Sequence, residues 1–268
     1  TITLDKFAGA VGSKLDGNAS ALPPIGAVTA IAHNDASPAD HAVLERTDRN
    51  ATHFWEEKAS VSVERKAYDG IEELDGKIYF VGGKDGVGAK NIAERYDPAT
   101  NQWETLNPMA VGRAGHAAAV LDGKLYAIGG IDQTSVEIYD PQTGQWSVGP
   151  SLPAYELDHA TAIAVGGKIL LIGSNTGQPN QVLELDPPST QWNQKTPMPT
   201  ARHGLKLVLF NDKVWAIGGE GGGSSLDKVE IYDPVSDSWT TGPSLVTPRY
   251  ALSAWVAHGR IYVAGGRD

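Results

Sequence analysis

The chain has 268 residues, a formal net charge of −10 and no cysteine. The absence of cysteine excludes disulfides and thiolate metal sites, and the negative charge argues against a nucleic-acid partner. Its apolar stretches are only as long as strands, so we expect no membrane insertion.

The first 58 residues contain segments that match a pattern repeated more clearly further along the chain. Asp5 and Asp48 each lie in a setting like that of the aspartates in the later units. We interpret residues 1–13 as two closing strands. Residues 14–58 are interpreted as a degenerate unit, in which only the stretch from Gly26 to Ala32 resembles an inner strand.

Four regular units follow, and the one from Arg113 to Trp146 is the clearest. It predicts four strands joined by tight turns, because apolar runs alternate with Asp-Gly, Gly-Gly and Asp-Pro pairs. The first three strands are expected at 116–121, 124–128 and 135–139, and the fourth contains Trp146. No long amphipathic helical pattern interrupts these units, so the chain is predicted to be all-β.

Two landmarks recur at fixed spacing in the four units. The third strand ends at an aspartate, and a tryptophan follows it by six residues: Asp97 and Trp103, Asp140 and Trp146, Asp186 and Trp192, Asp233 and Trp239. The aspartates are 43, 46 and 47 residues apart, and such a period is typical of a solenoid or a propeller. A glycine pair also follows each second strand, with Gly173-Ser174 as the imperfect member.

These landmarks resemble the kelch repeat, whose units form the blades of kelch β-propellers. The resemblance covers residues 60–268 and implies four-stranded antiparallel blades packed around a central channel. Such packing buries both faces of each small sheet, and the Trp and Tyr side chains are expected to fill the gaps between sheets. The resemblance is less specific for function, because one fold carries many functions.

The two ends of the chain predict how the ring closes. Only two strands follow Arg249, so residues 1–13 are expected to complete their blade and to remove the open sheet edge. We predict one domain, a six-bladed propeller. Residues 243–268 provide the inner strands of the last blade and residues 1–13 its outer strands. The other five blades are formed by residues 14–58, 59–106, 107–149, 150–196 and 197–242. The alternative has five blades, with residues 42–55 closing directly against the C-terminal strands.

Two sets of loops are expected to face one mouth of the channel, namely those entering each first strand and those after each glycine pair. In each unit a lysine or arginine follows the turn between the first two strands. The residue eleven positions before it, called here the column position, is mainly cationic across the five units: Lys66, Arg113, Leu157, Arg202 and Arg249. Neighbouring positions add further ligand-binding candidates: Lys84, Asn175, His203, Glu220, Tyr250 and Arg267. Because arginine binds carboxylate and phosphate groups with two parallel hydrogen bonds, the mouth is predicted to bind an anionic ligand.

These cations also have a structural interpretation, in which each pairs with a carboxylate of a neighbouring blade, such as Glu94, Glu137, Glu184 or Glu230. One unit departs from the others, because Leu157 replaces the arginine there and Glu156, Asp158 and His159 surround it. These three are the candidate catalytic residues, since carboxylates and imidazoles transfer protons. In residue types alone they resemble those of the sialic-acid mutarotases, which are six-bladed kelch proteins.

The predicted function is a binding module for an acidic peptide or an anionic glycan, acting as a monomer without cofactor or metal. The alternatives are an enzyme acting on an acidic sugar, and a scaffold propeller without a ligand at its mouth. The first residue is Thr1 rather than methionine, which favours a secreted or periplasmic location over a cytoplasmic one.

Overall fold

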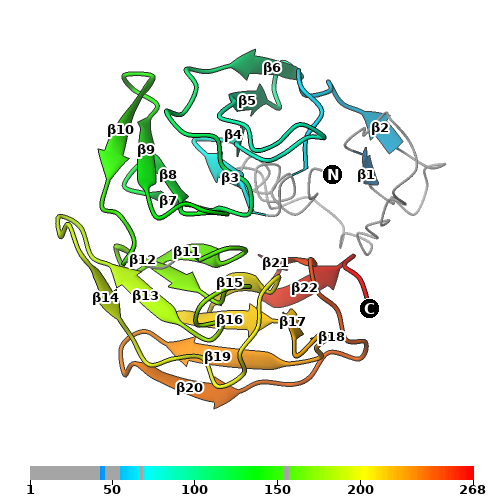
Figure 1. The fold of residues 1–268 in the computed structure, drawn as a ribbon. Helices are drawn as coiled ribbons and strands as arrows, with labels where there is room; N and C mark the ends of the chain where they lie inside the picture. Colours follow the sequence, from blue (N-terminus) through cyan, green and yellow to red (C-terminus); the bar gives the residue numbers. More distant parts are fainter. Residues whose placement is uncertain (1–42, 46–54, 67–68, 154–156) are drawn as a thin grey trace.

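The computed structural model describes residues 43–45, 55–66, 69–153 and 157–268, and every regular element among them is a β-strand. Figure 1 shows these strands gathered into small sheets around a common centre. The prediction of an all-β propeller is confirmed. The strands expected within 1–13 and 26–32 lie outside the described residues, so the number of blades stays a prediction.

Four sheets have four antiparallel strands each. Sheet 1 contains β3 (Ile71–Leu74), β4 (Lys77–Val81), β5 (Ala93–Asp97) and β6 (Gln102–Thr105). Sheet 2 contains β7 (Ala117–Leu121), β8 (Lys124–Ile128), β9 (Val136–Asp140) and β10 (Gln145–Gly149). Sheet 3 contains β11 (Thr161–Val165), β12 (Lys168–Ile172), β13 (Val182–Leu185) and β14 (Trp192–Gln194). Sheet 4 contains β15 (Lys206–Phe210), β16 (Lys213–Ile217), β19 (Val229–Asp233) and β20 (Ser238–Thr241).

The remaining strands form pairs. Sheet 5 contains β21 (Ser253–Ala257) and β22 (Arg260–Ala264), and a further pair contains β1 (Val43–Glu45) and β2 (Trp55–Glu57). A short hairpin of β17 (Glu220–Gly221) and β18 (Ser224–Ser225) follows the second strand of sheet 4. Among the described residues, sheet 5 is not hydrogen-bonded to β1 or β2, although the five-bladed alternative requires that pairing.

The first strand of each sheet lies innermost, beside the first strand of the next sheet (Figure 1). Contacts run from β3 to β7, from β7 to β11, from β11 to β15 and from β15 to β21. The order of the sheets along the chain is therefore their order around the ring. The first three strands of sheet 2 begin and end within one residue of the predicted positions, which confirms the strands predicted there.

Aromatic side chains fill the space between neighbouring sheets, as predicted. Tyr79 of sheet 1 and Tyr139 of sheet 2 are both buried, with ring centroids 6.0 Å apart, and Leu125 packs in the same core. Fully burying an apolar side chain contributes about 1.5–3 kcal/mol, and a small sheet cannot bury its faces alone. These cores between sheets therefore hold the ring together.

Each recurring tryptophan also joins two neighbouring sheets through its indole nitrogen. The Nε1 atom donates a hydrogen bond to a backbone carbonyl in the segment that precedes its own sheet: Trp103 to Ala59 at 2.7 Å, Trp146 to Asn107 at 2.8 Å, Trp192 to Pro150 at 2.8 Å, and Trp239 to Thr196 at 2.9 Å. The polar tip of each ring thus has a hydrogen-bond partner.

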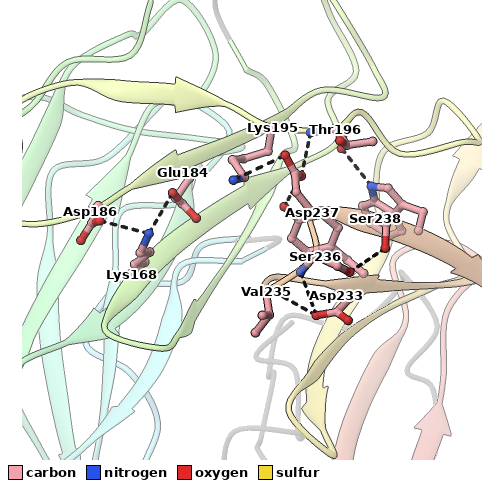
Figure 2. Close-up of polar contacts among 12 residues, drawn as sticks. Lys168, Glu184, Asp186, Lys195, Thr196, Asp233, Val235, Ser236, Asp237 and Ser238 are labelled. Carbon is pink, nitrogen blue, oxygen red and sulfur yellow. Dashed lines mark hydrogen bonds and ion pairs between the residues drawn. The ribbon is translucent and has the colours of Figure 1, made fainter.

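A turn aspartate strengthens the same junction between sheets 3 and 4, as Figure 2 shows. Asp237 Oδ1 accepts hydrogen bonds from the Thr196 backbone nitrogen at 2.9 Å and from the Tyr232 hydroxyl at 2.6 Å. Lys195 Nζ lies 3.4 Å from Asp237 Oδ2. Sheet 1 repeats the arrangement with Asn101, which accepts from the Ala59 nitrogen at 2.9 Å. The turn between the last two strands therefore holds the neighbouring chain segment.

The glycine pairs are required where the loops of two sheets meet. At Gly218, with φ +61°, an added Cβ would lie 2.5 Å from the Arg249 carbonyl oxygen of the next sheet. At Gly219, with φ +108°, it would lie 2.9 Å from the His203 carbonyl oxygen of the same sheet. Both the backbone conformation and the close approach exclude a side chain. The glycine pair therefore lets the backbones of the two converging loops come into contact.

Candidate functional site

The two predicted loop sets lie beside each other in all five sheets. Backbone hydrogen bonds join a residue three to five positions before each first strand to the residue after the glycine pair: Lys66 with Lys84, Ala114 with Ile131, Asp158 with Asn175, His203 with Glu220, and Tyr250 with Arg267. The donor–acceptor distances are 2.7–3.0 Å. Ten loop positions are thus held at one end of the ring by the backbone rather than by mobile side chains.

The column arginines of sheets 2 and 4 are core groups. Arg202 has no exposed surface, donates to the carbonyl oxygens of Gly218 and Ala216 at 2.8 and 3.1 Å, and forms an ion pair with Glu230. Burial lowers the pKa of Arg202 from its ordinary value, and the Glu230 carboxylate opposes this effect. The guanidinium is therefore an internal brace of its own sheet.

Arg113 has the same role in sheet 2. Its side chain is fully buried, lies 3.0 Å from Glu137 and donates to the Ser135 carbonyl oxygen at 2.7 Å. Both arginines thus pair with a carboxylate, as the structural interpretation predicted, but the carboxylate belongs to the same sheet and not to a neighbouring one, so that part of the prediction was wrong. Arg249 of sheet 5 is only half-buried, and it donates to the Gly265 carbonyl oxygen at 2.5 Å.

In sheet 1 the brace is Arg65, one residue before the predicted Lys66. Arg65 forms the buried ion pair with Glu94 and donates to the Gly82 carbonyl oxygen at 2.8 Å, as Arg202 does to Gly218. Sheet 1 has one more residue between this arginine and its first hairpin than sheets 2 and 4 have. A count of eleven residues back from the hairpin lysine therefore gives Lys66 in place of Arg65. Lys66 is instead exposed at the mouth.

Sheet 3 replaces this ion pair with two leucines. Leu157 stands at the arginine position, and Leu183 lies on β13 where the other sheets have their glutamate; both are buried in one core. Glu184 is therefore not the equivalent of Glu230. Its carboxylate lies 3.2 Å from Lys168 Nζ. Figure 2 shows this contact on the side of sheet 3.

Two of the candidate catalytic residues, Asp158 and His159, lie close together beside His203 of sheet 4. Asp158 Oδ1 lies 2.6 Å from His159 Nδ1, and the His159 and His203 rings are 6.2 Å apart at their centroids. Burial lowers the pKa of His203, and the nearby His159 acts in the same direction, whereas Glu220 and Asp158 oppose it. A carboxylate beside an imidazole can orient it for proton transfer. Glu156 lies outside the described residues.

Exposed cations mark the mouth on sheets 1 and 5. Lys66 and Lys84 face each other across their backbone bridge, and Arg267 pairs in the same way with half-buried Tyr250. All three cations are exposed. On the other side of the ring, sheets 3 and 4 present the exposed Asn175 and the half-buried Glu220. The mouth is thus more cationic on sheets 1 and 5 than on sheets 3 and 4.

A further polar group at the same end connects sheets that are not neighbours. The Asp69 carboxylate accepts hydrogen bonds from Thr161 Oγ1 and from Lys206 Nζ, both at 2.8 Å. None of these three residues was among the site residues predicted from the sequence. Thr161 and Lys206 are the first residues of β11 and β15, but Asp69 lies two residues before β3, so no single repeat position contains all three.

The described residues contain no group of three or more His, Cys, Asp or Glu side chains placed to hold a metal ion. Within the same part of the chain, no helix has the length and apolar character that a bilayer crossing requires.

Comparison with known proteins identifies the repeat. Residues 69–266 match the KLHDC2/KLHL20/DRC7 Kelch-repeats domain. The chain is 31% identical to mouse Kelch-like protein 35 over 195 residues, which is 73% of this chain and 26% of that protein. It is 32% identical to Kelch-like protein 26 of Danio rerio over 214 residues, 73% of this chain and 35% of that protein. A solved structure described as "Structure of YjhT" superposes with a TM-score of 0.70 at 22% identity, covering 91% of each chain, which shows the fold alone.

Proposed function

This chain belongs to the kelch-repeat family, and from that premise we propose that it is a binding module whose propeller mouth takes an anionic ligand. The ligand class that we favour is a carboxylate-rich peptide segment of a protein partner. An anionic glycan offers the same chemistry and is the other source to be tested. The matched chain spans only about a quarter to a third of its curated relatives, so the activity of any longer protein is also a proposal.

The observation that carries the proposal is the set of exposed cations held in place by paired loops. Lys66, Lys84 and Arg267 lie at backbone bridges, in a chain whose formal net charge is −10. Lysine and arginine at a concave end of a protein concentrate the local field and attract anions despite an acidic exterior. Arg113 and Arg202 support the site indirectly, because they hold the loops rather than face a ligand.

Fluorescence anisotropy with a labelled hexaglutamate peptide tests this proposal. We expect saturable binding that weakens as salt increases, and no binding of a hexaglutamine peptide. Changing Lys66, Lys84 and Arg267 together to glutamine should weaken binding by about tenfold or more, because the cations that attract the carboxylates are lost. A hyaluronan hexasaccharide, used as competitor, decides between the peptide and the glycan.

A matched control removes the same charge at the other end of the strands. Lys77, Lys124 and Lys213 begin the second strands, at the hairpins opposite the glycine pairs. Their joint change to glutamine should alter the affinity by less than about twofold. Equal losses in the two triple variants would contradict a site at the mouth. Absence of binding to both probes would leave a scaffold propeller whose partner binds elsewhere.

A further inference from the structure

Asp69, Thr161 and Lys206 meet although they come from three different sheets. Asp69 precedes β3 of sheet 1, Thr161 begins β11 of sheet 3, and Lys206 begins β15 of sheet 4. Sheet 2 separates Asp69 from Thr161, because first-strand contacts run from β3 through β7 to β11. The Asp69 carboxylate therefore reaches across the centre of the ring, at the end of the strands where the paired loops lie.

Both oxygens of this carboxylate have a donor. Thr161 Oγ1 donates to Oδ2, and Lys206 Nζ donates to Oδ1, each at 2.8 Å. The side chains of Lys206 and Asp69 are 12% and 9% exposed, so the ion pair is largely removed from water. The hydroxyl and the ammonium thus give each oxygen of the carboxylate one hydrogen-bond donor, and the ammonium adds the opposite charge.

We propose that Lys206 and Thr161 form a carboxylate-binding subsite at the centre of the mouth, which Asp69 occupies until a carboxylate of the acidic peptide replaces it. This inference rests on the proposed function and names the group that anchors the peptide. The donors come from separate sheets and the acceptor from a third, so an exchange of one carboxylate for another leaves the hydrogen bonds within each sheet unchanged. A peptide can bind only those molecules in which Asp69 has left the two donors. The apparent affinity for the peptide is therefore reduced in proportion to the fraction of molecules in that state.

The test compares four variants with the wild-type chain in the hexaglutamate anisotropy assay. The change Asp69→Asn keeps the shape of the side chain and removes its charge, so we expect about tenfold tighter binding. We expect Lys206→Met to weaken binding by about tenfold, and Thr161→Val by about threefold. The double variant Asp69→Asn/Lys206→Met should bind no more tightly than Lys206→Met alone, because Asp69 acts by occupying Lys206.

Thermal unfolding of each variant shows whether the fold is retained. If Asp69→Asn does not fold, the Asp69 carboxylate is required for the fold and the inference is wrong. Lys206→Met and Thr161→Val test the two donors independently of Asp69. If the mouth variant of Lys66, Lys84 and Arg267 loses binding while Asp69→Asn and Lys206→Met bind like wild type, the proposed function stands and this inference is overturned. If neither the wild-type chain nor Asp69→Asn binds the peptide, both fail.

Discussion

The guanidinium groups of Arg113 and Arg202 lie inside their sheets, where each has a carboxylate and backbone carbonyls as partners. A buried ion pair contributes little net stability, because desolvation of the two charges offsets their attraction. Loss of one partner is costly, since the other charge is then buried without compensation. Sheet 3 shows that the same position accepts an apolar pair, Leu157 and Leu183.

From this comparison we predict that a double substitution of the ion pair lowers the free energy of unfolding less than a single substitution does. Arg202→Leu should lower the free energy of unfolding by about 3–5 kcal/mol, because Glu230 is left buried without its cation. Arg202→Leu/Glu230→Leu should be more stable than the single variant, even though it removes more polar contacts. Urea unfolding followed by tryptophan fluorescence measures both. A double variant less stable than Arg202→Leu would show that sheet 4 cannot accept the packing of sheet 3.

At the scale of the element, the junctions between sheets depend on the turn that precedes each last strand. Asp237 of sheet 4 and Asn101 of sheet 1 each accept hydrogen bonds from the neighbouring segment and from a tyrosine of their own sheet. Both have positive φ, 51° and 55°. Asp and Asn tolerate this conformation and still carry an oxygen acceptor, which glycine does not.

Substitution of Asp237 separates these two roles. Asp237→Gly keeps the backbone conformation, as Gly144 does in sheet 2 with φ +67°, but removes the acceptor. We expect a loss of about 1–2 kcal/mol in the free energy of unfolding, because the Thr196 amide and the Tyr232 hydroxyl lose a partner. Asp237→Asn is the matched control and should change stability by less than about 0.5 kcal/mol. If the two variants are equally stable in urea unfolding, the junction does not depend on this oxygen.

The elements themselves could be predicted from the sequence because each blade is local. A hairpin pair, a glycine pair and a Trp six residues after an Asp all lie within one unit, and they place the strands of sheet 2 within one residue. The buried state of Arg113 could not be read from its column, since it depends on Glu137 two strands away. The meeting of Asp69 with Lys206, 137 residues apart, depends on the arrangement of the whole ring.

At the scale of the whole molecule, stability depends on how closely neighbouring sheets approach. His116 lies in such a junction, fully buried, where a Cβ on Gly82 of sheet 1 would be 2.6 Å from its ring. Leu205 and Leu252 occupy the same position before the first strands of sheets 4 and 5, and a Cβ added to a glycine of the preceding sheet would lie 2.9 Å from each of them. The junction between sheets 1 and 2 thus holds a titratable ring where the junctions of sheets 3 with 4 and of sheets 4 with 5 hold leucine.

Burial lowers the pKa of His116 from 6.5 to about 4, with Arg113 acting in the same direction and Asp69 against it. The unfolded chain therefore binds a proton between pH 6.5 and 4 that the folded chain does not bind. Stability should decrease as the pH falls through this window, by up to about 3 kcal/mol at pH 4, and this contribution should level off below it.

The substitution His116→Leu, which copies sheets 4 and 5, should remove this part of the acid dependence because nothing at the position then titrates. Urea unfolding at pH 7 and pH 5 measures it as the difference between the two midpoints, which should be smaller in the variant than in the wild-type chain. The carboxylates titrate in both proteins and cancel in the comparison. An equal pH dependence in the two proteins would mean that the junction opens to water before His116 is protonated.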